Sequence, residues 1–185
     1  CEHFKSFKKC YGKDISLSIN LSIEQLRDNN ITEKISKVLL DTETNAKDIR
    51  IEITESIAFN EDPNILQRLI EIRNLGISIS IDDFGKGYSS FNRLKTFPID
   101  ILKIDMDFVR GITSPSKKDR AIIRSIIQIA KNLNIAVLAE GVETKEQYTY
   151  LKDNGCDMIQ GYYFYKPMPA NEIENLISNP PGTAI

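Results

Sequence analysis

Short apolar runs alternate along the chain with longer segments in which apolar residues recur at helical spacing. The runs fall at 15–20, 49–55, 77–83, 101–105, 135–140 and 157–160. Their shortness and their many isoleucines predict six strands that are buried on both faces. The remaining segments predict helices over 23–40, 62–75, 118–133, 145–154 and 171–178. Gly76 and Gly155 directly follow two of these helices, where a glycine commonly ends a helix.

Strand–helix alternation of this kind predicts an α/β fold with a parallel sheet and helical crossovers. Two architectures fit, an open doubly wound sheet and a TIM-like (β/α) barrel. A doubly wound nucleotide fold would carry a glycine-rich turn after its first strand, but residues 20–22 read Asn-Leu-Ser. The nucleotide-fold signal is therefore weak, but both architectures stay open on these grounds. A closed barrel needs eight strands, so with six the barrel alternative would be a partial one.

Composition and charge exclude several classes of protein. The chain has 185 residues, 41% of them hydrophobic, and a net charge of −2, as expected for one globular domain. No apolar stretch is long enough for a transmembrane helix or a secretory leader, so we expect no membrane contact from this segment. The near-neutral charge argues against binding to a nucleic-acid polymer. Three cysteines without CxxC spacing (Cys1, Cys10 and Cys156) indicate reduced thiols and a cytoplasmic domain.

Polar residues that could carry chemistry close the predicted strands. They are Asn20, Glu52 with Glu55, Asp82, Asp83, Lys103 with Asp105, Glu140 and Gln160. In a parallel barrel all strands end at one rim, which holds the active site. Carboxylates gathered there would repel one another unless cations lay between them. Because the set contains no His or Cys, two Mg²⁺ or Mn²⁺ ions are expected, with one carboxylate of Asp82-Asp83 between them, as in phosphoryl displacement.

An acidic residue after a strand is also a common helix N-cap, and we expect that role for Asp62 and Asp157. For the whole set the metal interpretation is favoured, because the acids recur at successive strand ends. Lys103 lies between the apolar residues Leu102 and Ile104, so its side chain is expected to point into the barrel or its mouth. There it would pair with carboxylates and hold or polarise a water molecule.

Six motifs at these strand ends occur in order at compatible spacing. They are Asn20-Leu21-Ser22, Glu52-Ile53-Thr54-Glu55-Ser56, Asp82-Asp83-Phe84-Gly85, Leu102-Lys103-Ile104-Asp105, Ala139-Glu140-Gly141-Val142-Glu143 and Gln160-Gly161-Tyr162. From residue 15 to 178 the chain thus resembles the EAL domain, the bacterial cyclic-di-GMP phosphodiesterase. The resemblance implies a TIM-like barrel with two Mg²⁺ or Mn²⁺ ions. It also implies hydrolysis of one phosphodiester bond of cyclic di-GMP to linear pGpG.

The resemblance further implies which residues bind the metals. Asn20, Glu52, Asp82 and Asp83 correspond to metal ligands, and Asp83 belongs to the second ion. Glu140 corresponds to a further carboxylate that binds a metal or positions water.

Other positions match residues around the reaction. Lys103 resembles the lysine beside the catalytic water, and Glu143 and Gln160 resemble residues that bind water or substrate near the metals. Asp105 is expected to contact a guanine. Glu55 resembles the glutamate that holds the loop after the Asp pair.

Two features depart from the family pattern. The Glu-Ala-Leu tripeptide, which supplies a metal-ligand glutamate and a nearby substrate-binding arginine, is absent and is expected upstream of Cys1. Residues 1–185 are therefore expected to be the C-terminal portion of an EAL domain without its first two strands, and to be poorly active alone. Lys86 stands where the family's loop usually has threonine.

The resemblance leaves alternatives and implies partners. A catalytically degenerate EAL domain would bind cyclic di-GMP as a sensor or regulatory module, and a barrel remnant would serve only as an interaction domain. The expected partners are cyclic di-GMP, sensory or cyclase domains in a parent chain that could be anchored in a membrane, and a second copy in a homodimer.

Overall fold

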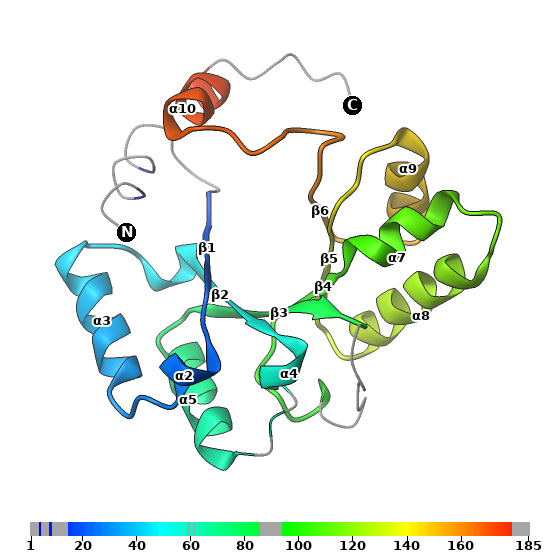
Figure 1. Ribbon diagram of the computed structural model, residues 1–185. Helices are drawn as coiled ribbons and strands as arrows, with labels where there is room; N and C mark the ends of the chain where they lie inside the picture. Colours follow the sequence, from blue (N-terminus) through cyan, green and yellow to red (C-terminus); the bar gives the residue numbers. More distant parts are fainter. Residues whose placement is uncertain are drawn as a thin grey trace.

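Six parallel strands form one sheet in the computed structural model, which describes residues 4, 8, 15–58, 60, 62–85 and 94–178. They are β1 (Leu17–Asn20), β2 (Ile49–Thr54), β3 (Ser78–Phe84), β4 (Ile101–Ile104), β5 (Ala136–Ala139) and β6 (Met158–Ile159). Their spatial order is their sequence order, β1 to β6, without the reversal that defines a doubly wound sheet. Figure 1 shows the sheet curving into part of a ring, with helices outside it. The fold is therefore a partial TIM-like barrel, as the family resemblance implied.

The crossover helices follow the predicted pattern closely. Predicted and observed bounds agree within one residue for α5 (Pro63–Asn74), α8 (Lys118–Asn132), α9 (Lys145–Asp153) and α10 (Ala170–Ser178). Asp62 caps α5 as expected, because its side chain accepts a hydrogen bond from the Asn64 N–H. Asp157 does not cap a helix. Its carboxylate accepts a hydrogen bond from the Val137 N–H at 2.8 Å and so links the β5 and β6 segments.

The prediction of one helix over 23–40 is wrong. Two helices stand there, α2 (Ile23–Leu26) and α3 (Ile31–Asp41), separated by a polar turn. The Asp28 carboxylate accepts a hydrogen bond from the Asn30 N–H at 2.9 Å, the local bonding by which Asp and Asn compete with helical hydrogen bonds.

Among the residues that the structure describes, four short helical segments were not predicted. They are α4 (Glu55–Ala58), α7 (Met106–Arg110) and the 3₁₀ turns η1 (Ala46–Asp48) and η2 (Gly111–Thr113). Most of the predicted loop over 84–90, with Lys86, lies outside the described residues, as do Cys1 and Cys10.

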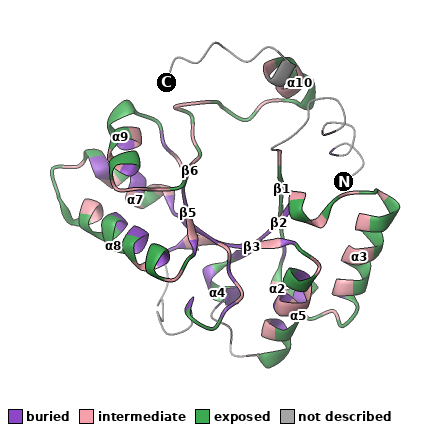
Figure 2. Ribbon diagram, turned by 180° about the vertical axis from the view of Figure 1, so that it is seen from behind, coloured by how far each residue is buried: buried purple, intermediate pink, exposed green. Residues whose placement is uncertain are grey.

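Side chains alternate between the two faces of each strand. On the outer face, buried isoleucines such as Ile53, Ile79 and Ile81 pack against the helices. Lys103 of β4 contacts Glu52 of β2, Asp82 of β3 and Glu140, which directly follows β5. The side chains that alternate with the buried isoleucines therefore line the concave face. Figure 2 shows the buried residues on the strands and on the helix sides that face them, whereas the outward helix surfaces are exposed.

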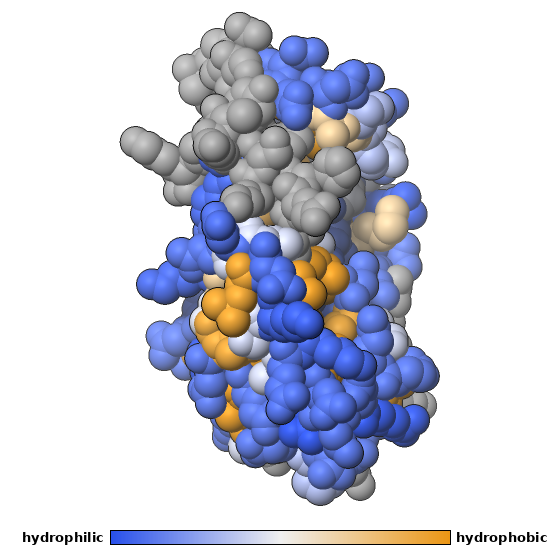
Figure 3. Space-filling view, turned by 90° about the vertical axis from the view of Figure 1, so that its left-hand side faces the viewer, coloured by the Kyte–Doolittle hydropathy of each residue, from blue (hydrophilic) through white to orange (hydrophobic). Residues whose placement is uncertain are grey.

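An apolar area is exposed where α3 lies beside β1. Figure 3 shows apolar side chains gathered on this side of the molecule among hydrophilic ones. Val38 and Leu40 of α3 are 46% and 74% exposed, and Ile19 of β1 is 37% exposed. A groove of about 210 Å³ there is lined by residues of β1, β2, α2 and α3. In the described part of the chain, no helix has the length and apolar character needed to span a bilayer.

Candidate functional site

Three carboxylates converge on one lysine at the carboxyl ends of the central strands. The Lys103 Nζ lies 2.7 Å from Glu52 Oε2, 3.0 Å from Asp82 Oδ1 and 2.9 Å from Glu140 Oε1. These four residues come from β2, β3, β4 and the end of β5, so residues distant in the sequence meet at one point. The structure confirms that Lys103 points inward and pairs with carboxylates.

Burial and ion pairing act in opposite directions on the lysine. Lys103 is 4% exposed, and burial alone would lower its pKa. Hydrogen bonds to Glu52, Glu140 and Asp82 outweigh this effect and hold the pKa of Lys103 above its ordinary value of 10.5. Its side chain is therefore an ammonium ion at neutral pH.

Glu140 experiences the opposite balance. Burial is the largest effect and raises its pKa above the ordinary value of 4.5, while the hydrogen bond and charge of Lys103 act to lower it. The neighbouring Asp82 raises it further, because a second carboxylate nearby disfavours the charged form of Glu140.

The two adjacent aspartates lie where β3 departs from regular pairing with β4. The register between β3 and β4 shifts between Ile81 and Phe84. Asp83 has a φ of 56°, a left-handed conformation that is uncommon for residues other than glycine, and its N–H donates to Asp82 Oδ1 at 3.0 Å. On a regular strand the two side chains would point to opposite faces; the departure from regular pairing breaks that alternation. Backbone strain of this kind concentrates at functional sites.

Glu55 anchors the segment that follows the aspartates. It is the first residue of α4 and 6% exposed, and its Oε2 accepts a hydrogen bond from the Gly85 N–H at 3.0 Å. Gly85 has a φ of 104°, which favours glycine at this position. The contact is the one expected for a glutamate that holds this loop.

The structure shows local contacts for four other predicted site residues. Asn20 is exposed at the end of β1, where it pairs in register with Glu52. Gln160 is exposed, and its N–H donates to the Ala139 carbonyl at 2.8 Å. The Glu143 carboxylate lies 3.9 Å from Arg110 Nη2. Asp105 is 2% exposed and caps α7 by accepting a hydrogen bond from the Asp107 N–H at 2.8 Å, so its guanine contact stays a prediction.

Two contributions to the site were not predicted from the sequence. One is Arg110, which lies near Glu143 on the unpredicted helix α7. The other is the close packing at Gly161, where an added Cβ would lie 2.1 Å from the Val142 carbonyl oxygen. Only glycine fits there, which fixes the segment after Gln160 against the one after Glu140. The sequence did carry a sign of this close packing, because Gly141 directly follows Glu140 and Gly161 directly follows Gln160.

The donor set fits hard divalent cations. Among the described residues, no group of three or more His, Cys, Asp or Glu side chains is arranged as a ready-made metal site. Yet the Lys103 ammonium, itself a cation, lies within 3.0 Å of oxygens from three carboxylates. Carboxylate oxygens without nitrogen or sulfur ligands are the chemistry that Mg²⁺ and Mn²⁺ prefer.

Comparison with known proteins shows the family to which the chain belongs. Residues 1–167 match the family model for the EAL domain. The cyclic di-GMP phosphodiesterase NbdA of Pseudomonas aeruginosa is 34% identical over 180 residues, covering 96% of this chain and 22% of NbdA. The chain spans between 20% and 40% of the length of the first curated relatives that it matches.

Two solved structures share the fold. The PaMucR phosphodiesterase in complex with c-di-GMP has a TM-score of 0.88 at 33% identity, covering 94% of this chain and 70% of that one. Klebsiella pneumoniae BlrP1 in its manganese and cyclic di-GMP complex has a TM-score of 0.77 at 29% identity, covering 87% of this chain and 40% of that one.

Proposed function

Because the chain belongs to the EAL domain family, we propose that it carries a phosphodiesterase site that hydrolyses one phosphodiester bond of cyclic di-GMP and gives linear pGpG. The observation that carries the proposal is the convergence of Glu52, Asp82 and Glu140 on Lys103. The proposal is supported by NbdA, whose name states this activity, and by PaMucR, whose structure holds this nucleotide.

We propose that Asn20, Glu52, Asp82, Asp83 and Glu140 hold two Mg²⁺ or Mn²⁺ ions. A divalent cation bound there would polarise a phosphoryl oxygen and make a nearby water more acidic. The carboxylates fit this role because they are oxygen donors with negative charge in excess of what the single ammonium of Lys103 offsets.

The reaction adds water across one ester bond. A new P–O bond forms from the water oxygen and one P–O ester bond breaks, and the proton that the attacking water loses ends on the leaving sugar oxygen. Glu140 accepts a hydrogen bond from the attacking water and positions it. Lys103 places its ammonium beside this water and beside the phosphoryl oxygens, whose negative charge grows in the transition state.

Residues around the cluster bind and position the substrate. Glu143 and Gln160 hold water or substrate, and Asp105 contributes to guanine recognition. Glu55 fixes the loop after the aspartates through the Gly85 N–H. In the protein at its natural length, sensory or cyclase domains would set the activity of this site.

The test is conversion of cyclic di-GMP to pGpG with Mn²⁺ by the purified protein at its natural length. Asp82→Asn removes a carboxylate that contacts Lys103, so turnover should fall by a factor of about 10³ or more with the circular dichroism spectrum unchanged. The control is Asp153→Asn, an exposed aspartate at the end of α9, which should keep wild-type turnover. Asp82→Asn turnover above about a tenth of wild type would remove this cluster from the mechanism.

A further inference from the structure

The Lys103 ammonium uses all of its hydrogen-bonding capacity inside the cluster. An ammonium group has three N–H donors and no acceptor. Three carboxylates surround it, at 2.7 Å, 3.0 Å and 2.9 Å, and each comes from a different strand segment. In this arrangement no donor remains for a water molecule or a phosphate. The role proposed for Lys103 in hydrolysis therefore requires that at least one of these contacts breaks.

The contacts can break without a change in the sheet. Lys103 lies between Leu102 and Ile104, which are 1% and 0% exposed, and its strand pairs in register with β5. The backbone at this position is therefore fixed by packing and by ladder hydrogen bonds. The side chain, in contrast, is a flexible four-carbon stem, so a change of rotamer can move the ammonium by itself.

The carboxylates that hold the ammonium belong to the set that would hold the metals. A divalent cation held by Glu52, Asp82 and Glu140 would lie close to the ammonium that contacts the same three carboxylates, and the two positive charges would repel each other. In the absence of a cation, however, the three carboxylates would repel one another, and the ammonium keeps them together.

We infer that Lys103 is an internal placeholder cation, which holds Glu52, Asp82 and Glu140 in place in the metal-free protein and is displaced from them when a divalent cation binds. The inference rests on the function proposed above, since it concerns the same site. It assigns Lys103 two successive positions. In the first, the ammonium is paired with carboxylates and unable to act; in the second it is released by the metal and free to donate to water or phosphate. Binding of the metal thereby makes the Lys103 ammonium available for hydrolysis.

The first experiment compares Mn²⁺ affinity without substrate. Lys103→Met keeps the length of the side chain and removes the competing charge, so the dissociation constant for Mn²⁺ should fall by about tenfold or more. The control is Lys118→Met, which removes the same charge from an exposed position at the start of α8 and should bind Mn²⁺ as wild type does. Affinity in Lys103→Met that is equal to or weaker than wild type, or undetectable binding, would overturn the inference, because a lysine that merely supports the site would give that result.

The second experiment uses the wild-type protein and so does not depend on how the variant folds. Amine labelling followed by mass spectrometry should modify Lys103 slowly in the metal-free protein, where it is 4% exposed, and several-fold faster at saturating Mn²⁺. Labelling of Lys118 should be the same in both states. A Lys103 labelling rate unchanged by Mn²⁺ would contradict displacement.

These outcomes separate the inference from the proposed function. Tighter Mn²⁺ binding by Lys103→Met in a protein that does not hydrolyse cyclic di-GMP would support the placeholder and contradict the phosphodiesterase. The opposite result is hydrolysis of cyclic di-GMP by the wild-type protein together with a Lys103→Met variant that binds Mn²⁺ no more tightly than wild type. It would support the phosphodiesterase and contradict the placeholder.

Discussion

Arg50 is the least expected residue of the concave face. Arg50 of β2 pairs in register with Ser18 of β1 and Ser78 of β3. It lies two residues before Glu52, so the two side chains are on the same face of the strand. Its Nη2 lies 3.9 Å from Met158 Sδ, so the side chain reaches from β2 to β6. Its Nε is buried and, within the described part of the chain, has no hydrogen-bond partner. A buried donor without an acceptor costs about 1–3 kcal/mol of stability.

Arg50→Met should therefore stabilise the protein. Methionine keeps an unbranched apolar stem that can fill the same space and removes the unpaired donor. We expect the free energy of unfolding to rise by about 1 kcal/mol in urea denaturation, with an unchanged m-value. Arg124→Met, at an exposed position on α8, serves as the control for loss of a positive charge. A loss of stability in Arg50→Met would mean that the guanidinium contributes more through its contacts than the buried Nε costs.

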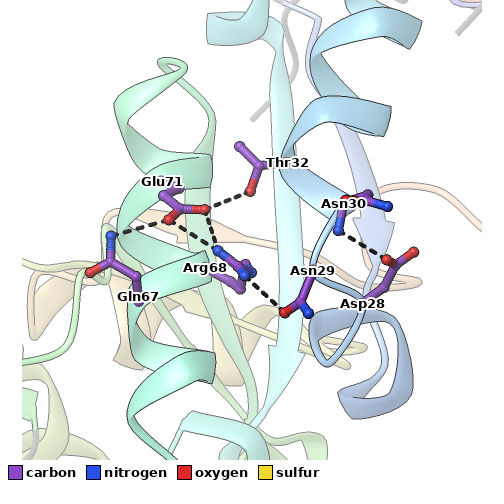
Figure 4. A network of polar contacts seen from close by, with 7 residues as sticks. All are labelled: Asp28, Asn29, Asn30, Thr32, Gln67, Arg68 and Glu71. Carbon is purple, nitrogen blue, oxygen red and sulfur yellow. Dashed lines mark hydrogen bonds and ion pairs between the residues drawn. The ribbon is translucent and has the colours of Figure 1, made fainter.

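At the scale of elements, the turn between α2 and α3 is the point at which the first crossover is fixed to the second. Figure 4 shows Asn29 of this turn and Thr32 of α3 meeting Arg68 and Glu71 of α5. Arg68 donates to Asn29 Oδ1 at 3.0 Å and to both oxygens of Glu71, while the Thr32 hydroxyl donates to Glu71 Oε2 at 3.0 Å. Asn29 of the turn and Thr32 of α3 thus supply contacts between the neighbouring crossovers.

This network predicts a pH-dependent contribution to stability. Hydrogen bonds from Gln67 and Arg68 lower the pKa of Glu71 below its ordinary value of 4.5. A carboxylate with a lowered folded-state pKa stabilises the fold above its unfolded pKa, and that contribution disappears as the pH falls through the folded-state pKa. Glu71→Gln should consequently have a lower Tm than wild type near pH 7, and the difference should shrink as the pH falls below the ordinary value of 4.5.

Thermal unfolding at a series of pH values measures this difference. Glu33→Gln, at an exposed position on α3, is the matched control, and its Tm difference from wild type should be small throughout. A Glu71→Gln difference that stays constant from neutral to acidic pH would show that the Glu71 charge does not stabilise the contact.

At the scale of the whole molecule, the sequence predicts the elements better than their contacts. Helix α8 was predictable to one residue because its buried positions, among them Ile123, Ile127 and Ala130, recur at helical spacing. The end of helix α2 after Leu26 was not predictable, because Ile31 and Ile35 continue the helical spacing of apolar residues across the turn. Periodicity also does not show which strands pair, so the choice between barrel and doubly wound sheet needed the observed strand order.

The candidate site was predictable only in part, because the sequence shows where strands end but not how they pair. Strand ends identified Glu52, Asp82, Lys103 and Glu140, because in a parallel barrel all such ends lie at one rim. The left-handed Asp83 could not be predicted, since a bulge arises from the register between β3 and β4 rather than from local composition. The contact of Glu143 with Arg110 could not be predicted either. Arg110 lies on α7, which has five residues and is too short to show a helical pattern of apolar positions.

The convergence of four strand ends predicts that metal binding stabilises the whole fold. Glu52, Asp82 and Glu140 belong to β2, β3 and the end of β5, so a cation held by them would join three separate segments of the sheet. Because the unfolded chain does not assemble this set, Mn²⁺ at about 100 times its dissociation constant should stabilise the native state by about 2.7 kcal/mol. The measurement is Tm with and without Mn²⁺. The increase should disappear in Asp82→Asn and persist in Asp153→Asn. An equal increase in Asp82→Asn would show that Mn²⁺ stabilises the protein at some other place, and the cluster around Lys103 would then have no part in holding the sheet together through a metal.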